Sequence, residues 1–296
     1  MPKNFTHAVM FHHFNNDVHP KGQGSVSSDT FREIICWLDN KYNILSPDKY
    51  FSKAIRNKLD NKDICLTFDD ALKCQYDIAL PILEENNLKA FFFVMSSPLK
   101  GQPNYLEIFR YFRCVFYKDL NNFYTDFFEQ VKETNPKIYL KNFNMFSNID
   151  YLNEFPFYSF EDRWFRFLRD LVLKEKRYNK MMLTLMSKKG FNFKDILSKL
   201  SMSEKNLISL DKKGHVIGLH SYNHPTKIES LPIEIQHQEY YKNKNHLETI
   251  LGEKKIYCMA HPCGSYNKET LSLLRKLGIK LGFRSNTKIK NIVSLL

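Results

Sequence analysis

The stretch Ile64-Cys65-Leu66-Thr67-Phe68-Asp69-Asp70 decides the fold, because it joins a short apolar run to two consecutive carboxylates. An apolar run without polar alternation is typical of a strand that is buried on both faces of a sheet. Two adjacent carboxylates at the end of such a strand are costly unless a cation or a proton stabilises them. The stretch therefore predicts a buried parallel strand with a functional site at its carboxyl end.

Strands and helices alternate on both sides of this stretch. Helices are expected after Ser28-Asp29 and around residues 76–83, 232–251 and 267–277. Residues 289–296 have the pattern of an element that has only begun. We predict strands in six segments: 7–14, 64–68, 89–95, 214–219, 256–260 and 279–284. This alternation is typical of parallel βα units and predicts an α/β fold.

The alternation breaks between residues 99 and 205, a segment rich in Phe, Tyr, Lys and Asn. Its aromatic residues recur every three or four positions, as in helices that pack a core. We therefore predict a helical insertion at 99–205, within a barrel domain formed by 1–98 and 206–296. The strands that flank the insertion should both end at the functional face, so we expect the insertion to border that face.

The composition favours a globular protein. The chain has 296 residues, of which 43% are hydrophobic and 26% charged, and this length fits one large α/β domain or barrel. No apolar run approaches the ~20 residues of a membrane helix, and the N-terminal residues lack the pattern of a signal peptide. We expect a cytoplasmic protein with no integral membrane segment, whose six Cys residues are reduced thiols.

The chain is basic, with 44 Lys and Arg against 32 Asp and Glu, a formal net charge of +12. A positive charge of this size can attract nucleic acid, an anionic membrane surface or an anionic small substrate. The Lys residues are scattered and no nucleic-acid-binding signature is present, so we expect no nucleic-acid partner. A sugar substrate that is nucleotide-linked or otherwise anionic fits the charge better. No feature of the sequence specifies the oligomeric state.

Polar clusters follow three of the predicted strands: Asp69-Asp70, the segment 220–224 and the segment 261–266. In α/β barrels the functional groups lie at the carboxyl ends of the strands. His220 and His224, at i and i+4, can share a metal ion. One carboxylate and two imidazoles leave coordination positions open, as in catalytic sites, and the other carboxylate is then available as a base. Taken singly, the Asp pair could also be a helix cap.

These residues resemble the motifs of the polysaccharide deacetylases of the NodB-homology type, carbohydrate esterase family 4. The resemblance covers about 1–98 and 206–290, but not the insertion. Four segments carry it: Thr67-Phe68-Asp69-Asp70 matches the TFDD motif, His220-Ser221-Tyr222-Asn223-His224-Pro225 matches H-S/T-x-x-H, Pro262-Cys263-Gly264-Ser265-Tyr266-Asn267 is similar to P-Y-G-x-Y-N, and Phe11-His12-His13-Phe14 is similar to Y-H-x-F.

The resemblance implies a distorted (β/α)7 barrel with a helical insertion. It also implies that Asp70, His220 and His224 bind a divalent metal, most often zinc, and that Asp69 is the general base. The metal would polarise the acyl carbonyl and lower the pKa of water. The backbone N–H of Cys263 would stabilise the oxyanion. For substrate binding we assign three residues: His12, Tyr266 and Arg284.

The sequence departs from the family pattern in its third and last motifs. Met259-Ala260-His261 lacks the usual Arg that orients the base, and Cys263 replaces the usual Tyr. The late Leu-x-His that supplies the general acid is absent, and no His follows His261. The leaving amine still needs a proton. We therefore predict that His13 or His261 donates it, with His12 as a further candidate and a longer chain as the alternative.

The function predicted from these features is a metal-dependent hydrolase that removes an N-acetyl or N-formyl group from an amino sugar. A cytosolic precursor of a surface glycan fits an unexported chain best. Two alternatives stay open, an O-acyl esterase or glycan hydrolase on the same scaffold and a metal-free barrel that only binds carbohydrate. The joint presence of the two Asp and two His residues argues against the metal-free barrel.

Overall fold

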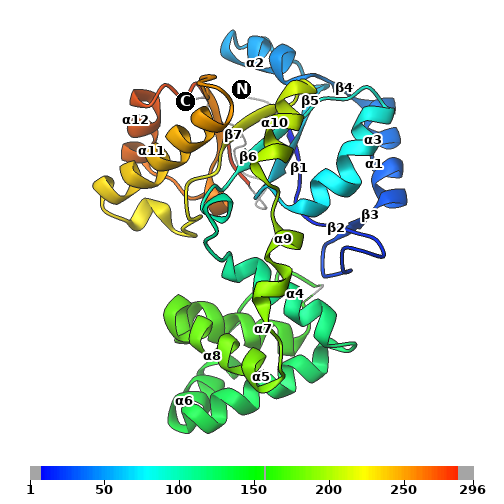
Figure 1. Cartoon of the computed structure of the whole chain (residues 1–296). Coiled ribbons are helices and arrows are strands. Elements are labelled where there is room, and N and C mark those ends of the chain that lie inside the picture. Colours follow the sequence, from blue (N-terminus) through cyan, green and yellow to red (C-terminus); the bar gives the residue numbers. More distant parts are fainter. Residues whose placement is uncertain (1–7, 157, 286–296) are drawn as a thin grey trace. The chain divides into compact units, whose positions relative to one another are not determined.

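The computed structural model describes residues 8–156 and 158–285 and divides the chain into two compact units (Figure 1). The first unit consists of Met1–Asn104 and Ser198–Leu296, and the second of Tyr105–Leu197. Residues 99–104 and 198–205, which we had placed in the insertion, thus group with the first unit. The element expected at 289–296 lies outside the described residues, and the placement of the insertion beside the functional face stays a prediction.

A curled parallel sheet forms the first unit, as the strand pattern predicts. Its strands follow the order β1 (Ala8–Phe11), β5 (Asp63–Asp69), β6 (Phe91–Val94), β7 (Val216–Leu219), β8 (Cys258–Ala260) and β9 (Leu281–Phe283). The short strand β4 (Asn43–Ile44) pairs with the start of β5. Within the described residues the sheet ends at β1 and β9, so it forms a half-barrel of parallel strands.

Helices connect these strands. They are α1 (Ser28–Lys41), α2 (Pro47–Ile55), a π-helical turn η1 (Gln75–Ala79) that continues into α3 (Leu80–Glu85), the 3-10 turn η2 (Pro98–Lys100), α10 (Glu204–Lys212), the 3-10 turn η5 (Ile228–Ser230), α11 (Ile233–Ile250), the 3-10 turn η6 (Pro262–Gly264) and α12 (Lys268–Lys276). The cap of α1 lies one residue earlier than predicted, because the Ser27 hydroxyl accepts the Thr30 N–H.

The first predicted strand is interrupted. β1 ends at Phe11, and β2 (Phe14–Asn15) pairs instead with β3 (Val26–Ser27) in a separate small sheet. His12 and His13 therefore lie between two strands, at the carboxyl end of β1. The interruption frees both imidazoles from sheet packing, which a single continuous strand would not do.

The core explains why the strands read as unbroken apolar runs. Alternate residues of each strand point to opposite faces of the sheet. On β6, Phe92 and Val94 pack in the larger cluster beneath the helices, whereas Phe91 and Phe93 pack in a second cluster with Tyr50 of α2. Both faces are thus buried, and a polar residue within the strands has no solvated side to occupy.

The second unit is helical in its described residues. Its elements are α4 (Tyr105–Phe116), α5 (Leu120–Thr134), α6 (Pro136–Ser147), α7 (Phe160–Phe167), the π-helical turn η3 (Leu168–Leu173), α8 (Lys174–Lys188), the 3-10 turn η4 (Phe193–Ile196) and the start of α9 (Leu197–Leu200). Its aromatic residues form a core, as their spacing predicts. The rings of Phe127 and Phe165, for example, lie 5.0 Å apart in an edge-to-face arrangement.

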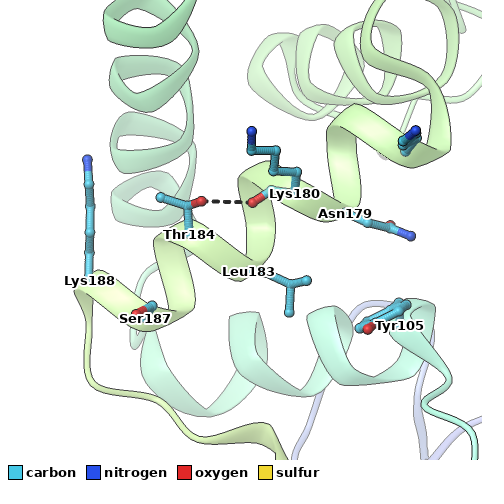
Figure 2. A pocket seen from close by; sticks show the side chains of 8 residues that line it. Tyr105, Asn179, Lys180, Leu183, Thr184, Ser187 and Lys188 are labelled. Atoms are coloured by element: carbon cyan, nitrogen blue, oxygen red, sulfur yellow. Dashed lines mark hydrogen bonds between the residues drawn. The ribbon is translucent and has the colours of Figure 1, made fainter.

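A hollow of about 670 Å³ lies on this helical unit, along one face of α8 (Figure 2). Lys176, Lys180 and Lys188 line it together with Tyr105 of α4 and several small polar side chains. Its lining contains neither a carboxylate nor an imidazole, so it offers no group for acid–base or metal chemistry. Throughout 8–156 and 158–285, no helix has both the length and the apolar character that crossing a membrane requires.

Candidate metal centre

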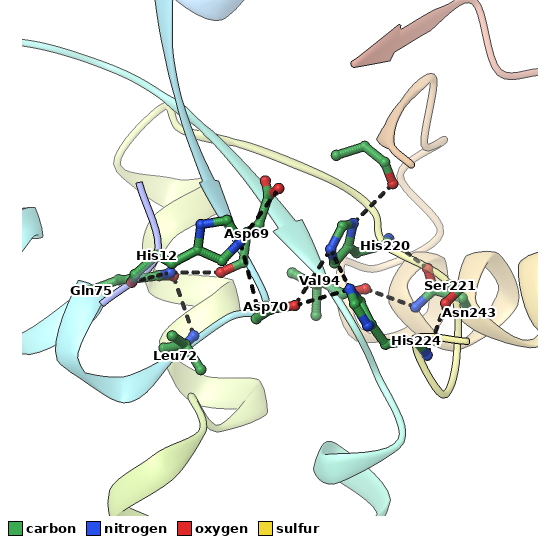
Figure 3. Close-up of polar contacts among 11 residues, drawn as sticks. His12, Asp69, Asp70, Leu72, Gln75, Val94, His220, Ser221, His224 and Asn243 are labelled. Carbon is green, nitrogen blue, oxygen red and sulfur yellow. Dashed lines mark hydrogen bonds and ion pairs between the residues drawn. The ribbon is translucent and has the colours of Figure 1, made fainter. Parts of the chain in front are cut away.

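The ends of β5 and β7 bring Asp70, His220 and His224 together (Figure 3). Nε2 of His220 lies 3.4 Å from Oδ1 of Asp70, Nε2 of His224 lies 3.6 Å from the same oxygen, and the two Nε2 atoms are 3.1 Å apart. Ligands at ~2.0–2.2 Å from a tetrahedral ion are about 3.3–3.6 Å from one another. The three donor atoms therefore fit around one metal ion.

The backbone at these positions is unusual. Asp70, Ser221 and His224 have φ values of 75°, 60° and 57°, in the left-handed region that residues other than glycine seldom adopt. Each such residue costs on the order of 1–3 kcal/mol and persists only where its surroundings hold it in place. The local conformation is therefore set by contacts outside the motifs themselves.

His220 is held on both its backbone and its side chain. Its Nδ1 donates a hydrogen bond to the carbonyl oxygen of Ala260 at 2.9 Å, which leaves Nε2 to face Asp70. Its backbone N–H donates to Oδ1 of Asn243, a buried residue of α11. A hydrogen bond on the far nitrogen of a metal-binding imidazole selects the tautomer and the ring orientation.

Protons and a metal compete for the two imidazoles. Burial lowers the pKa of His224 to about 4, so its ring is neutral at pH 7. Burial also opposes protonation of His220, but its hydrogen bond to Asp70 and the charge of Asp69 raise its pKa to about 9. Both imidazoles must be neutral to bind a metal, so at pH 7 loading of the site would release the proton of His220.

Asp69 and Asp70 are adjacent but have opposite electrostatic environments. Burial raises the pKa of Asp69, and the charges of His220 and His12 offset only part of this effect. Burial acts in the same direction on Asp70, but the hydrogen bond from His220 and the charges of His224 and His12 bring its pKa well below the usual value. Two carboxylates with separated pKa values commonly divide the roles of proton acceptor and permanent anion.

Asp69 is buried beside the metal ligands. Its Oδ1 has no hydrogen-bond partner among the described residues, and its Oδ2 lies 4.0 Å from Nε2 of His12. Nε2 of His12 also lies 3.8 Å from Oδ2 of Asp70. The ring of His13 stacks against that of His12, with centroids 6.2 Å apart. The structure thus places His12 beside both carboxylates and the ring of His13 next to that of His12.

The segment after β8 forms the third side of this region. His261 is buried, stacks on Tyr266 with ring centroids 4.4 Å apart, and has no hydrogen-bond partner on either ring nitrogen among the described residues. Arg284 donates from Nη1 to the Tyr266 hydroxyl at 3.1 Å. Burial lowers the pKa of His261 to about 3, so its ring is neutral at pH 7. Cys263 is exposed in the turn η6, with φ 51°.

Sequence reasoning missed Gln75, which joins two parts of the site. Its side chain is buried and donates to the carbonyl oxygens of Asp69, at 2.6 Å, and of His12, at 2.9 Å, while it accepts the Leu72 N–H. Gln75 begins the π-helical turn η1, and such turns are frequent at functional sites. A Gln in a predicted helix gives no signal of this role.

Comparison with known proteins identifies the family. The family model described as polysaccharide deacetylase matches residues 56–111 and 174–282, more than half of the chain. The chain belongs to the polysaccharide deacetylase family. The matched segments contain Asp69, Asp70, His220 and His224, which confirms the family resemblance that the sequence motifs indicate. Membership in this family supports a hydrolase that removes acyl groups from carbohydrate. No curated protein matches the chain significantly.

Solved structures of deacetylases share the fold. The Streptococcus pyogenes deacetylase PplD is 18% identical, with a TM-score of 0.55 over 95% of this chain and 83% of its own. IcaB from Ammonifex degensii is 16% identical, with a TM-score of 0.55 over 94% and 82%. A de-N-acetylase from Aggregatibacter actinomycetemcomitans is 16% identical, with a TM-score of 0.54 over 95% and 88%. These similarities confirm the predicted NodB-type barrel fold.

Proposed function

We propose that this member of the family is a metal-dependent hydrolase that removes an N-acetyl or N-formyl group from an amino sugar. One observation carries the proposal: the donor atoms of Asp70, His220 and His224 are 3.1–3.6 Å apart, beside the buried carboxylate of Asp69. Two imidazoles and one carboxylate form a ligand set that suits zinc and leaves a coordination position open. When bound, the metal would polarise the acyl carbonyl and lower the pKa of water.

In this mechanism Asp69 accepts the proton of the attacking water. Its raised pKa makes it a better base than an exposed Asp, and its partner-free Oδ1 can approach the water directly. The backbone N–H of Cys263 is proposed to donate to the acyl oxygen as negative charge develops there. Nitrogen leaves poorly without a proton, so a general acid must act after the attack.

The candidate acids are His13 and His261, and both assignments stay predictions. His261 is neutral at pH 7 because burial lowers its pKa to about 3. It can carry the proton only while negative charge develops on the substrate nearby, since an adjacent anion raises the pKa of an imidazole. His13 stacks on His12, which lies beside both carboxylates.

The proposed substrate is an N-acyl amino sugar that carries an anionic group. The formal net charge of +12 supports a phosphate-bearing carrier, such as a nucleotide or a lipid phosphate. His12, Tyr266 and Arg284 are proposed to contact the sugar. Of these, Arg284 brings a cation to the hydroxyl of Tyr266, and His12 lies beside the two carboxylates. The cytosolic location of such a precursor stays a prediction.

The test is acyl release from N-acetyl and N-formyl amino sugars offered free, as oligosaccharides and linked to a nucleotide. We expect acetate or formate and a free amine in equal amounts, loss of release with a chelator, and recovery on addition of Zn²⁺. Asp70→Ala serves as the inactive control. Release that survives both the chelator and Asp70→Ala would disprove the metal role. Sugar binding without release from any substrate would favour the carbohydrate-binding alternative.

A further inference from the structure

Helix α11 contacts both ends of the loop that carries the two histidine ligands. At the first end, Oδ1 of Asn243 accepts the His220 N–H at 3.1 Å. Near the second end, the Glu239 carboxylate accepts both the backbone N–H and the side-chain amide of Asn223, each at 2.7 Å. Glu239 and Asn243 are one helical turn apart and share a face of α11. We propose that they are positioning residues that hold the loop 220–224 in its metal-binding conformation.

The loop needs such support because of its own backbone. Ser221 and His224 adopt φ values of 60° and 57° without being glycine, and such conformations persist only where other contacts over-determine them. Within the loop, the Ser221 hydroxyl accepts the His224 N–H at 3.0 Å. That contact closes the loop on itself but does not tie it to the rest of the fold. Two backbone carbonyl contacts and the contacts from α11 provide that tie: the Ser97 N–H donates to the Tyr222 carbonyl at 3.0 Å, and Nδ1 of His220 donates to the Ala260 carbonyl. Of these, the contacts from α11 are the ones made by side chains outside the loop.

Asn243 also fixes the loop relative to the neighbouring strand. Its side chain is fully buried, and Nδ2 donates to the Val94 carbonyl at 3.0 Å (Figure 3). Nδ2 also donates to the Ser96 hydroxyl at 2.8 Å. One amide thereby joins the end of β6 to the start of the loop after β7. Because all of its hydrogen-bonding groups have partners, the Asn243 side chain has one orientation, and this orientation fixes the position of the His220 backbone N–H.

Glu239 is buried, and no Lys or Arg in the described part of the chain forms an ion pair with it. A buried carboxylate without a cation is costly unless its oxygens accept good hydrogen bonds. Here both oxygens are used by Asn223. Glutamine has the same shape but one acceptor oxygen and no charge, so Glu239→Gln loses both charge-assisted hydrogen bonds to Asn223 and keeps at most neutral ones.

The same helix offers a matched control. Glu248 is buried to a similar degree and accepts the Ile256 N–H at 2.9 Å and the Lys244 ammonium at 2.6 Å, away from the loop. Glu248→Gln therefore makes the same chemical change on the same helix, away from the loop. Only Glu239→Gln is expected to alter the loop.

The inference rests on the proposed metal site, so the experiment measures both Zn²⁺ affinity and the loop of the metal-free chain. Competition with a chromophoric chelator should show that Glu239→Gln binds Zn²⁺ about 10- to 100-fold more weakly than the wild type does. This is the usual effect of losing a hydrogen-bonding group that orients the metal ligands. Glu248→Gln should stay within about twofold of the wild type. Amide hydrogen exchange at residues 221–224 should accelerate in Glu239→Gln alone.

Asn223→Ala, at an exposed position, removes only the side-chain half of the contact and provides a variant that folds. It should weaken Zn²⁺ binding less than Glu239→Gln does. Equal Zn²⁺ affinity and equal loop exchange in the wild type, Asn223→Ala and Glu239→Gln would overturn the inference, and so would an equal loss in Glu239→Gln and Glu248→Gln. The two proposals can also fail separately. If the wild type does not bind Zn²⁺ but residues 221–224 still exchange faster in Glu239→Gln than in Glu248→Gln, the proposed function is wrong and the support of the loop by α11 is correct.

Discussion

Nε2 of His220 lies 3.4 Å from Oδ1 of Asp70, although β6 separates the strands that carry the two residues. Strands two places apart in a sheet are about 10 Å apart. The side chains meet because both follow the carboxyl ends of their strands and turn over the end of β6, where the sheet curls. The geometry of the candidate metal site is therefore a property of the strand order and of the curl, and it depends on the backbone turns at Asp70 and His224.

Removal of a ligand should abolish metal binding. We expect one Zn²⁺ per wild-type chain by elemental analysis and less than a tenth of that in His224→Ala, because two remaining donors bind weakly. Saturating Zn²⁺ at 100- to 1,000-fold above Kd should stabilise the wild type by about 3–4 kcal/mol. Thermal unfolding with and without Zn²⁺ measures this, with Glu248→Gln as a control away from the loop. A Zn²⁺-dependent shift of equal size in His224→Ala would remove His224 from the site.

Asp69→Asn should reduce turnover about 10²- to 10⁴-fold while metal content stays unchanged, because the amide has nearly the same shape but cannot accept the proton. Acyl-release kinetics and metal analysis on the same preparation test this. If Asp69 were a ligand instead of a base, the variant would lose metal together with activity.

The two candidate acids can be separated by their variants. If His261 donates the proton, His261→Gln should lower turnover about 10²-fold or more on amide substrates and much less on an O-acetyl ester, whose alcohol leaves more easily. His13→Gln should then have little effect on the ratio of amide turnover to ester turnover. The reverse pattern would assign the role of general acid to His13. Turnover on the amide that survives in both variants would show that neither is the acid.

Gly218→Ala should destabilise the first unit. A Cβ at this position of β7 would lie 2.6 Å from the Phe93 ring and 2.9 Å from the Cys258 carbonyl oxygen. Overpacking of this kind costs about 1–3 kcal/mol, which urea unfolding can measure. The double variant Gly218→Ala/Phe93→Leu should recover part of the loss, because it removes the ring but not the backbone oxygen. An unchanged free energy of unfolding in Gly218→Ala would show that the sheet adjusts freely here.

Buried His215 should make the stability depend on pH. Burial, with a smaller effect from Lys89, lowers its pKa from 6.5 to about 4, and its Nδ1 accepts the Ala90 N–H. Between those two pH values the unfolded chain binds the proton and the folded chain does not, so stability falls as the pH decreases from 6.5 toward 4. This His alone should cost about 2 kcal/mol between pH 7 and pH 5.

Urea unfolding at pH 7 and pH 5 checks this value. His215→Gln keeps an acceptor for Ala90 but does not titrate, so its free energy of unfolding should change about 2 kcal/mol less between the two pH values than that of the wild type. The difference between the two proteins isolates His215 from the other buried histidines. Equal changes in both proteins would contradict a lowered pKa for His215.

The sequence by itself determined the parallel α/β fold and the four residues at its centre. Unbroken apolar runs can be buried only as inner strands, and polar groups that directly follow such strands meet at one edge of the sheet. Asp69, Asp70, His220 and His224 stand at those positions, so local pattern and chain order were sufficient to identify them.

The tertiary structure alone decided which residues support that centre. Gln75, Glu239 and Asn243 occupy helices whose sequences do not distinguish a buried hydrogen-bonding residue from a solvated one. It also decided that β1 stops before His12 and that His12 lies beside both carboxylates. The reason is that these roles depend on contacts between segments far apart in the chain, whereas sequence periodicity reports only which face of one segment is buried.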